Sequence, residues 1–297
     1  MRIIRGKKAL ITGAASGIGR AIALALAQQG ADVFLVDINE DGLADVAREI
    51  GRHGTKVVTA TCDLSDPAQI EALTANLRRR WNGLNILVNN AGITYYGHTH
   101  LMTGAQWNRI MAVNLLAPIQ LTHKLLPLLL TAGEAHILNV SSMFGLATWR
   151  KTAAYQTSKF GLVGFSAALR AEYCSDSFGV TALCPGFVRS SLLEAGETDK
   201  ADRQLAVPAW ICASAEQTAA KAIRAIHRNQ GVVVVTPAAH FYWRLARLFP
   251  GLVDWLTREG WRRRGRPAIS PDRETAPAGD VAAGRDRPKQ YREEMRA

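Results

Sequence analysis

A cluster of glycines separates a short apolar stretch from a helical pattern near the start of the 297-residue chain. Residues 9–12 have the composition of a buried strand, three glycines follow within residues 13–19, and residues 20–29 have helical periodicity that ends at Gly30. Glycines allow a tight turn and a close approach to a pyrophosphate, which the amides at the start of a helix can bind. The stretch predicts the first strand, turn and helix of a dinucleotide-binding domain, although a glycine turn alone can also be purely structural.

The second predicted strand, residues 32–37, ends in Asp37, where a carboxylate can hold the adenosine ribose of a dinucleotide. An NADP site usually offers a cation to the 2′-phosphate, but Ser16 is uncharged and Ile38 and Asn39 follow Asp37. The pattern therefore favours NAD over NADP. The alternative is that Asp37 caps the next helix, although Asn39 is better placed for that role.

Predicted strands and helices continue to alternate as far as residue 237. Further strands are expected over residues 56–60, 85–89, 135–142, 180–184 and 232–236, and further helices over 40–53, 66–81, 106–130, 153–175 and 215–228. This alternation predicts one doubly wound α/β domain with a mostly parallel sheet and helices on both faces. Asp63, just beyond its strand, is expected either to contact the adenine end of a cofactor or to cap the following turn.

Tyr155 and Lys159 are four residues apart in a predicted helix and therefore lie on the same face. A fixed cation favours a phenolate, so Lys159 is expected to lower the pKa of Tyr155 and to fit it for proton transfer. Ser142 ends the apolar run that begins at residue 135. A strand end and the next helix can bring hydroxyl, phenol and amine together; the alternative is an ordinary pair on a surface helix.

The combined motifs resemble those of the short-chain dehydrogenase/reductase family, in order and in spacing, over roughly residues 5 to 237. They are Thr12-Gly-x3-Gly17-Ile-Gly19, Asn89-Asn-Ala-Gly92, Asn114, Ser142, Tyr155-x3-Lys159 and Pro185-Gly186. The resemblance implies a Rossmann-type fold and reversible NAD-dependent oxidation of a secondary alcohol to a ketone. It also implies assembly as a homodimer or homotetramer through the helices at 106–130 and 153–175.

The resemblance also implies roles for individual residues. Tyr155 would be the acid-base group, Ser142 would orient the reacting oxygen, Lys159 would hold the nicotinamide ribose, and Asn114 would position a water. The expected cofactor-binding residues are Gly13, Ser16, Gly17, Ile18, Gly19, Asp37, Asp63, Leu64, Asn90, Ala91, Gly92, Tyr155, Lys159, Pro185, Gly186, Val188 and Ser190. Ser190 stands where the family often has Thr, and it retains the hydroxyl.

Two assignments have alternatives in the sequence. Ser141 is the rival of Ser142, but only Ser142 has the family's spacing to Tyr155. Asn114 could instead satisfy backbone groups inside its helix, and both roles are compatible. The whole chain could also be an NADPH-dependent ketone reductase, or a non-catalytic cofactor-sensing protein, since a fold does not fix a function.

The predicted substrate is an apolar alcohol or ketone, since the candidate pocket residues are largely apolar. Tyr95 and Phe144 are expected to contact it, together with Ser142 and Tyr155. Further candidates are Tyr96, Met143, Leu146, Trp149, Phe187, Leu192 and Leu193. Core packing is the alternative for each of them, and Arg150 or Lys151 could instead recognise an acidic group.

Beyond residue 239 the composition changes. Residues 240–266 hold six aromatic residues and seven Arg and are expected to form two short amphipathic helices broken at Pro250-Gly251, while residues 267–297 are predicted to be a disordered tail. We expect 240–266 either to pack on its own domain or a neighbouring subunit, or to lie on a membrane surface.

Composition limits the other partners. Although the net charge is +11, the chain has no recognised nucleic-acid motif, and no nucleic acid or metal is expected. Four scattered cysteines suit a reducing compartment, and no stretch reaches the length of uninterrupted apolar residues that a membrane span needs. The predicted location is the cytoplasm, with contact to the inner face of a membrane through 240–266.

Overall fold

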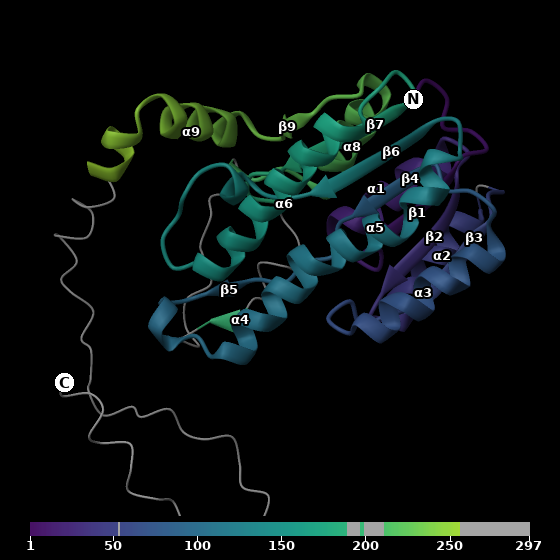
Figure 1. Ribbon diagram of the computed structural model, residues 1–297, viewed down its shortest axis with the longest axis horizontal. Coiled ribbons are helices and arrows are strands. Elements are labelled where there is room, and N and C mark those ends of the chain that lie inside the picture. The colour runs from purple at the N-terminus through teal and green to yellow at the C-terminus, as the bar shows by residue number, and fades with distance from the viewer. Residues whose placement is uncertain (53, 189–196, 199–210, 256–297) are drawn as a thin grey trace, which may run out of the picture. The chain divides into compact units, whose positions relative to one another are not determined.

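A sheet of seven parallel strands runs through the main unit of the protein (Figure 1). The computed structural model describes residues 1–52, 54–188, 197–198 and 211–255. The strands are β1 (Lys8–Thr12), β2 (Asp32–Asp37), β3 (Val57–Thr61), β4 (Ile86–Asn89), β6 (Ala135–Val140), β7 (Phe178–Cys184) and β9 (Val232–Val234). Their order across the sheet is β3-β2-β1-β4-β6-β7-β9. Every neighbouring pair is parallel, which confirms the predicted doubly wound fold.

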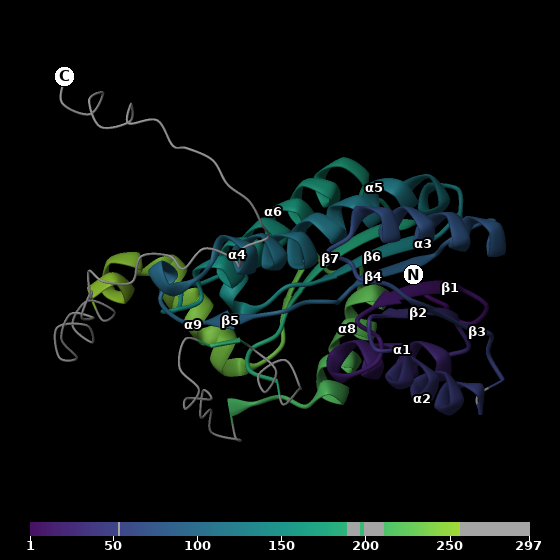
Figure 2. The same ribbon diagram turned by 90° about the horizontal axis from the view of Figure 1, so that it is seen from below.

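Helices cover both faces of this sheet (Figure 2). One face carries α1 (Gly17–Gln28), α2 (Glu40–Gly51) and α8 (Ala215–Arg228), and the other carries α3 (Pro67–Arg80), α5 (Ala117–Leu130) and α6 (Ala153–Tyr173). Successive residues of a strand point to opposite faces, so Ile11 enters the first core and Leu10 the second. Burial of both faces explains why these strands are continuous apolar runs.

The single helix predicted over 106–130 is divided into three parts. It consists of α4 (Gly104–Met111), a π-helical turn (Ala112–Leu116) and α5. Asn114 lies in the π-helical turn, and its side chain bonds to the backbone of Ile93. The wider turn therefore coincides with a tertiary contact that a periodic pattern does not reveal.

Among the described residues, the helical run Gly104–Leu130 is the one long and apolar enough to cross a membrane by length and composition. Its apolar side is used inside the protein, since Leu121, Leu125 and Leu129 are buried in the core beneath the sheet. This burial accounts for part of the run, since 39% of its apolar window is buried inside the protein.

The main compact unit extends from Met1 to Pro250, and a second unit comprises Gly251–Ala297, of which only residues 251–255 are described. Within the main unit, α9 (Pro237–Leu248) follows β9, so the beginning of the segment predicted as an appendage packs with the domain. The tail predicted over 267–297 lies outside the described residues.

A small second sheet pairs β5 (Tyr95–Tyr96) with β8 (Glu197–Thr198) in parallel. The register joins Tyr95 to Glu197 and Tyr96 to Thr198. Each strand has only two residues, which is too short for a hydrophobic alternation that would predict a strand from the sequence. This pairing fixes one part of the segment after β7 against the loop that follows β4.

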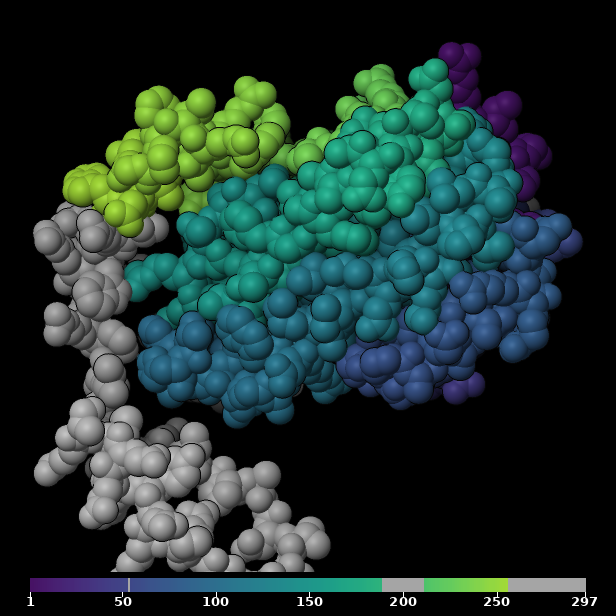
Figure 3. Space-filling model, in the orientation of Figure 1, coloured from purple at the N-terminus to yellow at the C-terminus, as the bar shows by residue number. Residues whose placement is uncertain are grey.

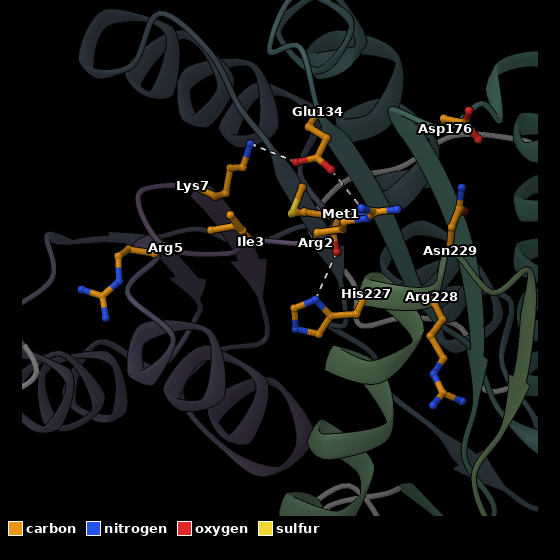
Figure 4. A pocket seen from close by; sticks show the side chains of 10 residues that line it. All are labelled: Met1, Arg2, Ile3, Arg5, Lys7, Glu134, Asp176, His227, Arg228 and Asn229. Atoms are coloured by element: carbon orange, nitrogen blue, oxygen red, sulfur yellow. Dashed lines mark hydrogen bonds and ion pairs between the residues drawn. The ribbon is translucent and has the colours of Figure 1, made fainter.

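A cavity of about 750 Å³ lies at the amino ends of the strands (Figure 4). Its basic lining is partly neutralised: the Glu134 carboxylate forms ion pairs with the Lys7 ammonium at 3.2 Å and the Met1 ammonium at 3.7 Å. His227 Nδ1 lies 3.1 Å from the Met1 carbonyl oxygen. Open α/β sheets bind ligands at the opposite, carboxyl edge, so this cavity is not the candidate active site.

A histidine is buried in the sheet near the same edge. His136 on β6 is 1% exposed, and its Nε2 lies 2.8 Å from the Thr181 hydroxyl of β7. Its Nδ1 has no hydrogen-bond partner among the described residues. Burial, together with nearby positive charges that include Arg170, lowers the pKa of His136 to about 3. The imidazole is therefore neutral in the folded protein at ordinary pH.

Candidate active site

The predicted site residues meet at the carboxyl edge of the main sheet. Gly13 follows β1, Asp37 ends β2, Asn90 follows β4, Ser142 lies two residues beyond β6, and Pro185 follows β7. Parallel strands end at the same edge, so these positions are close in space although they are far apart in sequence. This edge is where doubly wound sheets bind dinucleotides.

The turn after β1 is a bare backbone cradle. Gly13 has φ +66°, and a Cβ atom there would lie 2.8 Å from the Ala91 Cα. A Cβ on Gly19 would lie 2.0 Å from the Gly13 carbonyl oxygen. Gly17, with φ +53°, begins α1, and Ile18 packs against the core beneath. Side chains are therefore excluded at Gly13 and Gly19, and the amides of the first helical turn remain as anion donors.

Asp37 is tied to this cradle. Its Oδ2 accepts a hydrogen bond from the Ala15 amide at 3.0 Å, and its Oδ1 accepts one from the Asn39 amide at 3.0 Å. Asn39, not Asp37, caps α2, because its side chain accepts from the Gly42 amide. A carboxylate has about four acceptor sites, so Asp37 can still accept hydrogen bonds from ribose hydroxyls.

Asp63 stabilises its own turn. Its Oδ1 accepts hydrogen bonds from the Ser65 amide at 2.8 Å and from the Ser65 hydroxyl at 2.7 Å, and these bonds lower the pKa of the Asp63 carboxyl. Asp66, not Asp63, caps α3. Leu64 is buried in the core next to them. The turn-capping role expected for Asp63 is thus present, and the carboxylate remains partly exposed at the cofactor edge.

The loop after β4 is anchored to the cradle through Thr12. The Thr12 hydroxyl accepts hydrogen bonds from the amides of Asn90 and Ala91 at 3.0 and 3.1 Å. In return, Asn90 Nδ2 donates to the carbonyls of Thr12 and Gly13 at 2.9 and 3.1 Å. These bonds hold two of the predicted cofactor segments against each other.

Asn114 and Lys159 meet beside Gly92. A Cβ atom on Gly92 would lie 3.3 Å from Asn114 Oδ1 and 3.4 Å from Lys159 Nζ. The Asn114 side chain accepts from the Ile93 amide at 2.8 Å and donates to the Ile93 carbonyl at 2.9 Å. Asn114 therefore satisfies backbone groups, but they belong to the loop after β4 and not to its own helix, as the alternative had it.

Ser158 is a site residue that the sequence did not single out. Its hydroxyl accepts a hydrogen bond from Asn114 Nδ2 at 3.1 Å and donates one to the Tyr155 carbonyl at 2.7 Å. It therefore links the π-helical turn to the helix that carries Tyr155. Its place inside the Tyr155-x3-Lys159 segment was the only signal that could have indicated it.

Tyr155, Ser142 and Lys159 are brought together at this edge. The Ser142 side chain lies beside the Tyr155 phenol, where hydrogen bonding acts to lower the pKa of Tyr155. Lys159 Nζ lies 5.7 Å from the centre of the Tyr155 ring and donates to the Val140 carbonyl at 2.9 Å. All three residues are buried, with exposed fractions of 3 to 8%. The geometry is that of a proton donor or acceptor held between a hydroxyl and a cation.

Ser141 and Ser142 have different partners. The Ser141 hydroxyl donates to the Lys159 carbonyl at 2.9 Å, so it braces the helix. The Ser142 hydroxyl accepts from the Phe144 amide at 3.1 Å and also contacts Tyr155. Of the two serines, Ser142 is therefore the one beside the phenol.

Burial is the largest influence on the pKa values of Tyr155 and Lys159. It raises the pKa of Tyr155 to about 12, although the hydrogen bond with Ser142 acts to lower it. Burial also lowers the pKa of Lys159 to about 8. We expected Lys159 to lower the Tyr155 pKa, and the direction found is the opposite, because desolvation disfavours the charged form of each group.

The segment after β7 completes the edge. A Cβ atom on Gly186 would lie 2.3 Å from the Thr236 hydroxyl oxygen, so only glycine fits there without displacing Thr236. The Pro185 carbonyl accepts from the Met143 amide at 2.7 Å, and Val188 is buried and bridged to Ala213. Ser16 lies at the start of α1. Ser190, Leu192 and Leu193 lie outside the described residues.

An apolar wall stands against Tyr155. Met143, Phe144, Tyr155 and Ala239 form one buried cluster, against which Phe187 and Tyr242 pack. Phe144 stacks on Trp149 with ring centres 5.8 Å apart and meets Phe187 edge-on at 5.8 Å. Next to this wall is an apolar cavity of about 180 Å³. It is lined by Met143, Trp149, Phe187, Ile211, Thr236, Ala238, Ala239 and Tyr242.

Helix α9 contributes a residue that the sequence did not assign to the site. The Tyr242 hydroxyl donates to the Thr148 carbonyl at 2.6 Å, and its ring meets Trp149 edge-on with centres 6.1 Å apart. Tyr95, in contrast, is buried in a separate cluster with Ile110 and Ala154. The wall of the cavity therefore comes from segments that follow β6, β7 and β9, and not from Tyr95.

No group of three or more His, Cys, Asp or Glu side chains in the described ranges is arranged to hold a metal ion. The chemistry that the geometry supports is proton transfer by Tyr155 to or from an oxygen held by Ser142, next to a glycine cradle able to take a dinucleotide. The turn fits such a cofactor, since Gly13 and Gly19 pack without side chains against the neighbouring backbone and leave the amides at the start of α1 as donors to a pyrophosphate.

Comparison with known proteins points to one family. The family described as short chain dehydrogenase matches residues 7–201. The 3-oxoacyl-acyl-carrier-protein reductase FabG of Salmonella typhimurium is 34% identical over 215 residues, which cover 72% of this chain and 87% of that protein.

Two solved structures show the same architecture. A short chain dehydrogenase/reductase from Burkholderia phymatum, in complex with NAD, has a TM-score of 0.77 and 26% identity, covering 85% of this chain and 96% of that chain. A candidate NAD(P)-dependent gluconate 5-dehydrogenase from Beutenbergia cavernae, with NADP bound at low occupancy, has a TM-score of 0.69 and 30% identity, covering 79% of this chain and 96% of that chain.

Proposed function

Because the chain belongs to the short-chain dehydrogenase/reductase family of NAD(P)-dependent oxidoreductases, we propose that it interconverts an apolar secondary alcohol and its ketone with NAD. The observation that carries this proposal is the buried contact of Tyr155 with Ser142, with Lys159 beside it and an apolar wall against it. Oxidation removes a hydride from the carbinol carbon and a proton from its hydroxyl.

The bound nicotinamide supplies the hydride acceptor or donor, and the residues of this chain manage the proton and the geometry. Ser142 donates a hydrogen bond to the reacting oxygen and so places it next to the Tyr155 hydroxyl. Tyr155 takes the hydroxyl proton when an alcohol is oxidised and returns one when a ketone is reduced. Burial raises the pKa of Tyr155 and so opposes the phenolate that oxidation needs. In the proposed reaction Lys159, with its ammonium 5.7 Å from the centre of the ring, is the cation placed to favour that phenolate.

The apolar substrate class rests on the wall described above. The cavity shares Met143 and Ala239 with the cluster that contains Tyr155, and it is lined almost entirely by hydrocarbon and aromatic groups, with Thr236 as the polar exception. Burial of an apolar substituent against such a lining is favourable, whereas the hydroxyl groups of a sugar would find few hydrogen-bond partners there. We therefore expect substrates with a hydrocarbon or aromatic group next to the reacting carbon.

The preference for NAD rests on Asp37. Its carboxylate lies at the end of β2 and is held by the Ala15 amide, where it can accept ribose hydroxyls and would repel a 2′-phosphate. The cation Arg20 lies on α1 but is paired with Glu49. We expect NAD to have the higher kcat/KM, and Asp37→Ala to narrow the gap; a preference of the unmodified enzyme for NADP would refute the assignment.

A second candidate is an NADPH-dependent ketone reductase. It is favoured by the similarity to a 3-oxoacyl-acyl-carrier-protein reductase and by the NADP bound in one of the similar structures. Measuring alcohol oxidation and ketone reduction with both cofactors separates the two candidates. Absence of turnover in every combination, with intact cofactor binding, would instead favour the cofactor-sensing alternative.

The test of the mechanism is Tyr155→Phe, which removes the proton carrier and retains the ring. On a substrate found by screening, we expect kcat to fall by at least about a hundredfold, the contribution typical of acid-base catalysis. Binding of NAD, measured by fluorescence, should change little. Tyr173→Phe on the same helix is the matched control, because Tyr173 packs on Phe178 away from the site. Retention of near-normal turnover by Tyr155→Phe would refute the mechanism.

A further inference from the structure

Helix α9 is fixed to the domain by one of its faces. Ala239 is 1% exposed and lies in the cluster that contains Tyr155. Tyr242 bonds to the Thr148 carbonyl and packs on Trp149. Both residues also line the apolar cavity. The inner face of α9 is therefore part of the wall of the candidate active site.

The outer face of the same helix is apolar and uncovered. Phe241 is 71% exposed, Leu248 is 69% exposed, and Phe249, just past the helix, is 57% exposed. Residues at a spacing of three or four share a helical face, so Phe241, Leu245 and Leu248 form one stripe. Figure 3 shows α9 in yellow-green at the surface along one edge of the main unit. Within the stripe Phe241 and Leu248 are exposed, and Leu245 between them is partly buried.

The charge beside the stripe indicates what would cover it. Arg244 and Arg247 are both exposed, and the twelve residues of α9 include no Asp or Glu. Pairing of this helix with the same helix of a second copy would bring arginines together without an acidic partner on either helix. The phosphates of an anionic lipid surface can pair with the arginines. The acyl chains just below the headgroups can take up the aromatic and aliphatic side chains.

We propose that the outer face of α9, consisting of Phe241, Leu245, Leu248 and Phe249 with Arg244 and Arg247, docks this protein on an anionic lipid surface. The helix lies in the plane of the interface with its apolar stripe among the headgroups. Because its inner face lines the cavity, docking brings the lipid phase to the apolar side of the active site. This last consequence rests on the proposed function, whereas the docking itself does not.

The experiment is flotation of the full-length protein with vesicles of phosphatidylcholine, alone or mixed with phosphatidylglycerol. We expect flotation with the anionic vesicles only, and its loss at high salt. The double variant Arg244→Glu with Arg247→Glu should reduce binding by at least about tenfold, given the attraction that each basic residue adds near an anionic surface. The double variant Phe241→Ser with Leu248→Ser should reduce it comparably, because it removes the inserted side chains.

Matched controls carry the same substitutions elsewhere. Ile3→Ser changes an apolar residue that is 66% exposed, and Arg79→Glu with Arg80→Glu reverses two exposed charges on α3. These variants should float like the unmodified protein, and circular dichroism should show that every variant is folded. The readout needs no turnover, so its result is independent of whether the proposed reaction is correct.

Three outcomes would overturn the proposal. One is absence of flotation with anionic vesicles at low salt. Another is equal flotation of the unmodified protein and both α9 variants, which would place lipid binding elsewhere in the chain. The third is a protein that does not float and whose oligomer dissociates in the Phe241→Ser, Leu248→Ser variant, which would show that a second copy covers the stripe.

Discussion

Mild acid should destabilise this protein because His136 is buried in its neutral form. The pKa of His136 is lowered to about 3 in the folded protein, from an ordinary value of 6.5. Between these two values the unfolded chain binds a proton that the folded protein does not, so the free energy of unfolding must fall as the pH falls. The perturbation that tests this is His136→Gln, which removes the titrating group and can retain a hydrogen bond to Thr181.

The size of the effect follows from the shift. One pKa unit corresponds to about 1.4 kcal/mol, so the full shift is equivalent to about 5 kcal/mol, reached near pH 3. Between pH 7 and pH 5 the loss attributable to His136 should be about 2 kcal/mol. This loss of about 2 kcal/mol occurs above the pH range in which most carboxylates take up protons. The effect of His136 on stability can therefore be separated from that of the carboxylates.

The assay is urea unfolding at a series of pH values between 7 and 5, followed by circular dichroism. The unmodified protein should lose about 2 kcal/mol more than His136→Gln over this range, whatever the stability of the variant at pH 7. His123→Gln, which removes an exposed histidine on α5, is the matched control for the substitution.

Equal pH dependence in the unmodified protein and in His136→Gln would refute the reasoning. It would mean that the folded protein accommodates an imidazolium at this position, for example by relaxation around the unpartnered Nδ1. A steeper loss in the variant would refute it as well, since the variant has no group at 136 that can gain a proton.

Three further predictions concern the site and the assembly. Gly19→Ala should weaken NAD binding by at least about tenfold in a fluorescence titration. The reason is that the new Cβ would lie 2.0 Å from the Gly13 carbonyl oxygen, and overpacking costs about 1–3 kcal/mol. Gly51→Ala is the control, because the space around Gly51 is open. Asn114→Ala should lower the free energy of unfolding in urea by about 1–3 kcal/mol, since it leaves the Ile93 backbone groups without their partner. Light scattering at micromolar concentration should show a dimer or tetramer. Phe160 on α6 is 41% exposed, and Phe160→Glu should shift the oligomer toward monomer. An unmodified protein that is monomeric would contradict the predicted assembly.

The parts of the fold that sequence predicts well are those in which local pattern and burial agree. The helix expected over 215–228 is found as α8 with the same bounds, because Ser214 and Gln217 form a capping box that defines its start. The apolar runs of the sheet are likewise found within one or two residues of their predicted limits. Spacing alone was sufficient to place Tyr155 and Lys159 on one face of α6.

The parts that sequence did not predict depend on contacts between distant segments. The π-helical turn depends on the Ile93 backbone, which lies in a loop outside the helix. Tyr242 joins the active-site wall only because α9 folds back onto Thr148. The directions of the Tyr155 and Lys159 pKa shifts were missed for the same reason: the spacing of the pair was visible in the sequence, whereas the extent of its burial was not.

The position of β1 in the sheet has a consequence for how the protein is made. β1 precedes the other strands of this sheet in the chain, yet it lies in the interior of the sheet, with Ala9 paired to Val33 on one side and to Ile86 on the other. During translation β2 can pair with β1 early, but the other edge of β1 stays open until β4 has left the ribosome. An open apolar edge is a site of wrong pairing between chains. The nascent chain is therefore exposed to wrong pairing from the time that β1 leaves the ribosome until β4 has followed it.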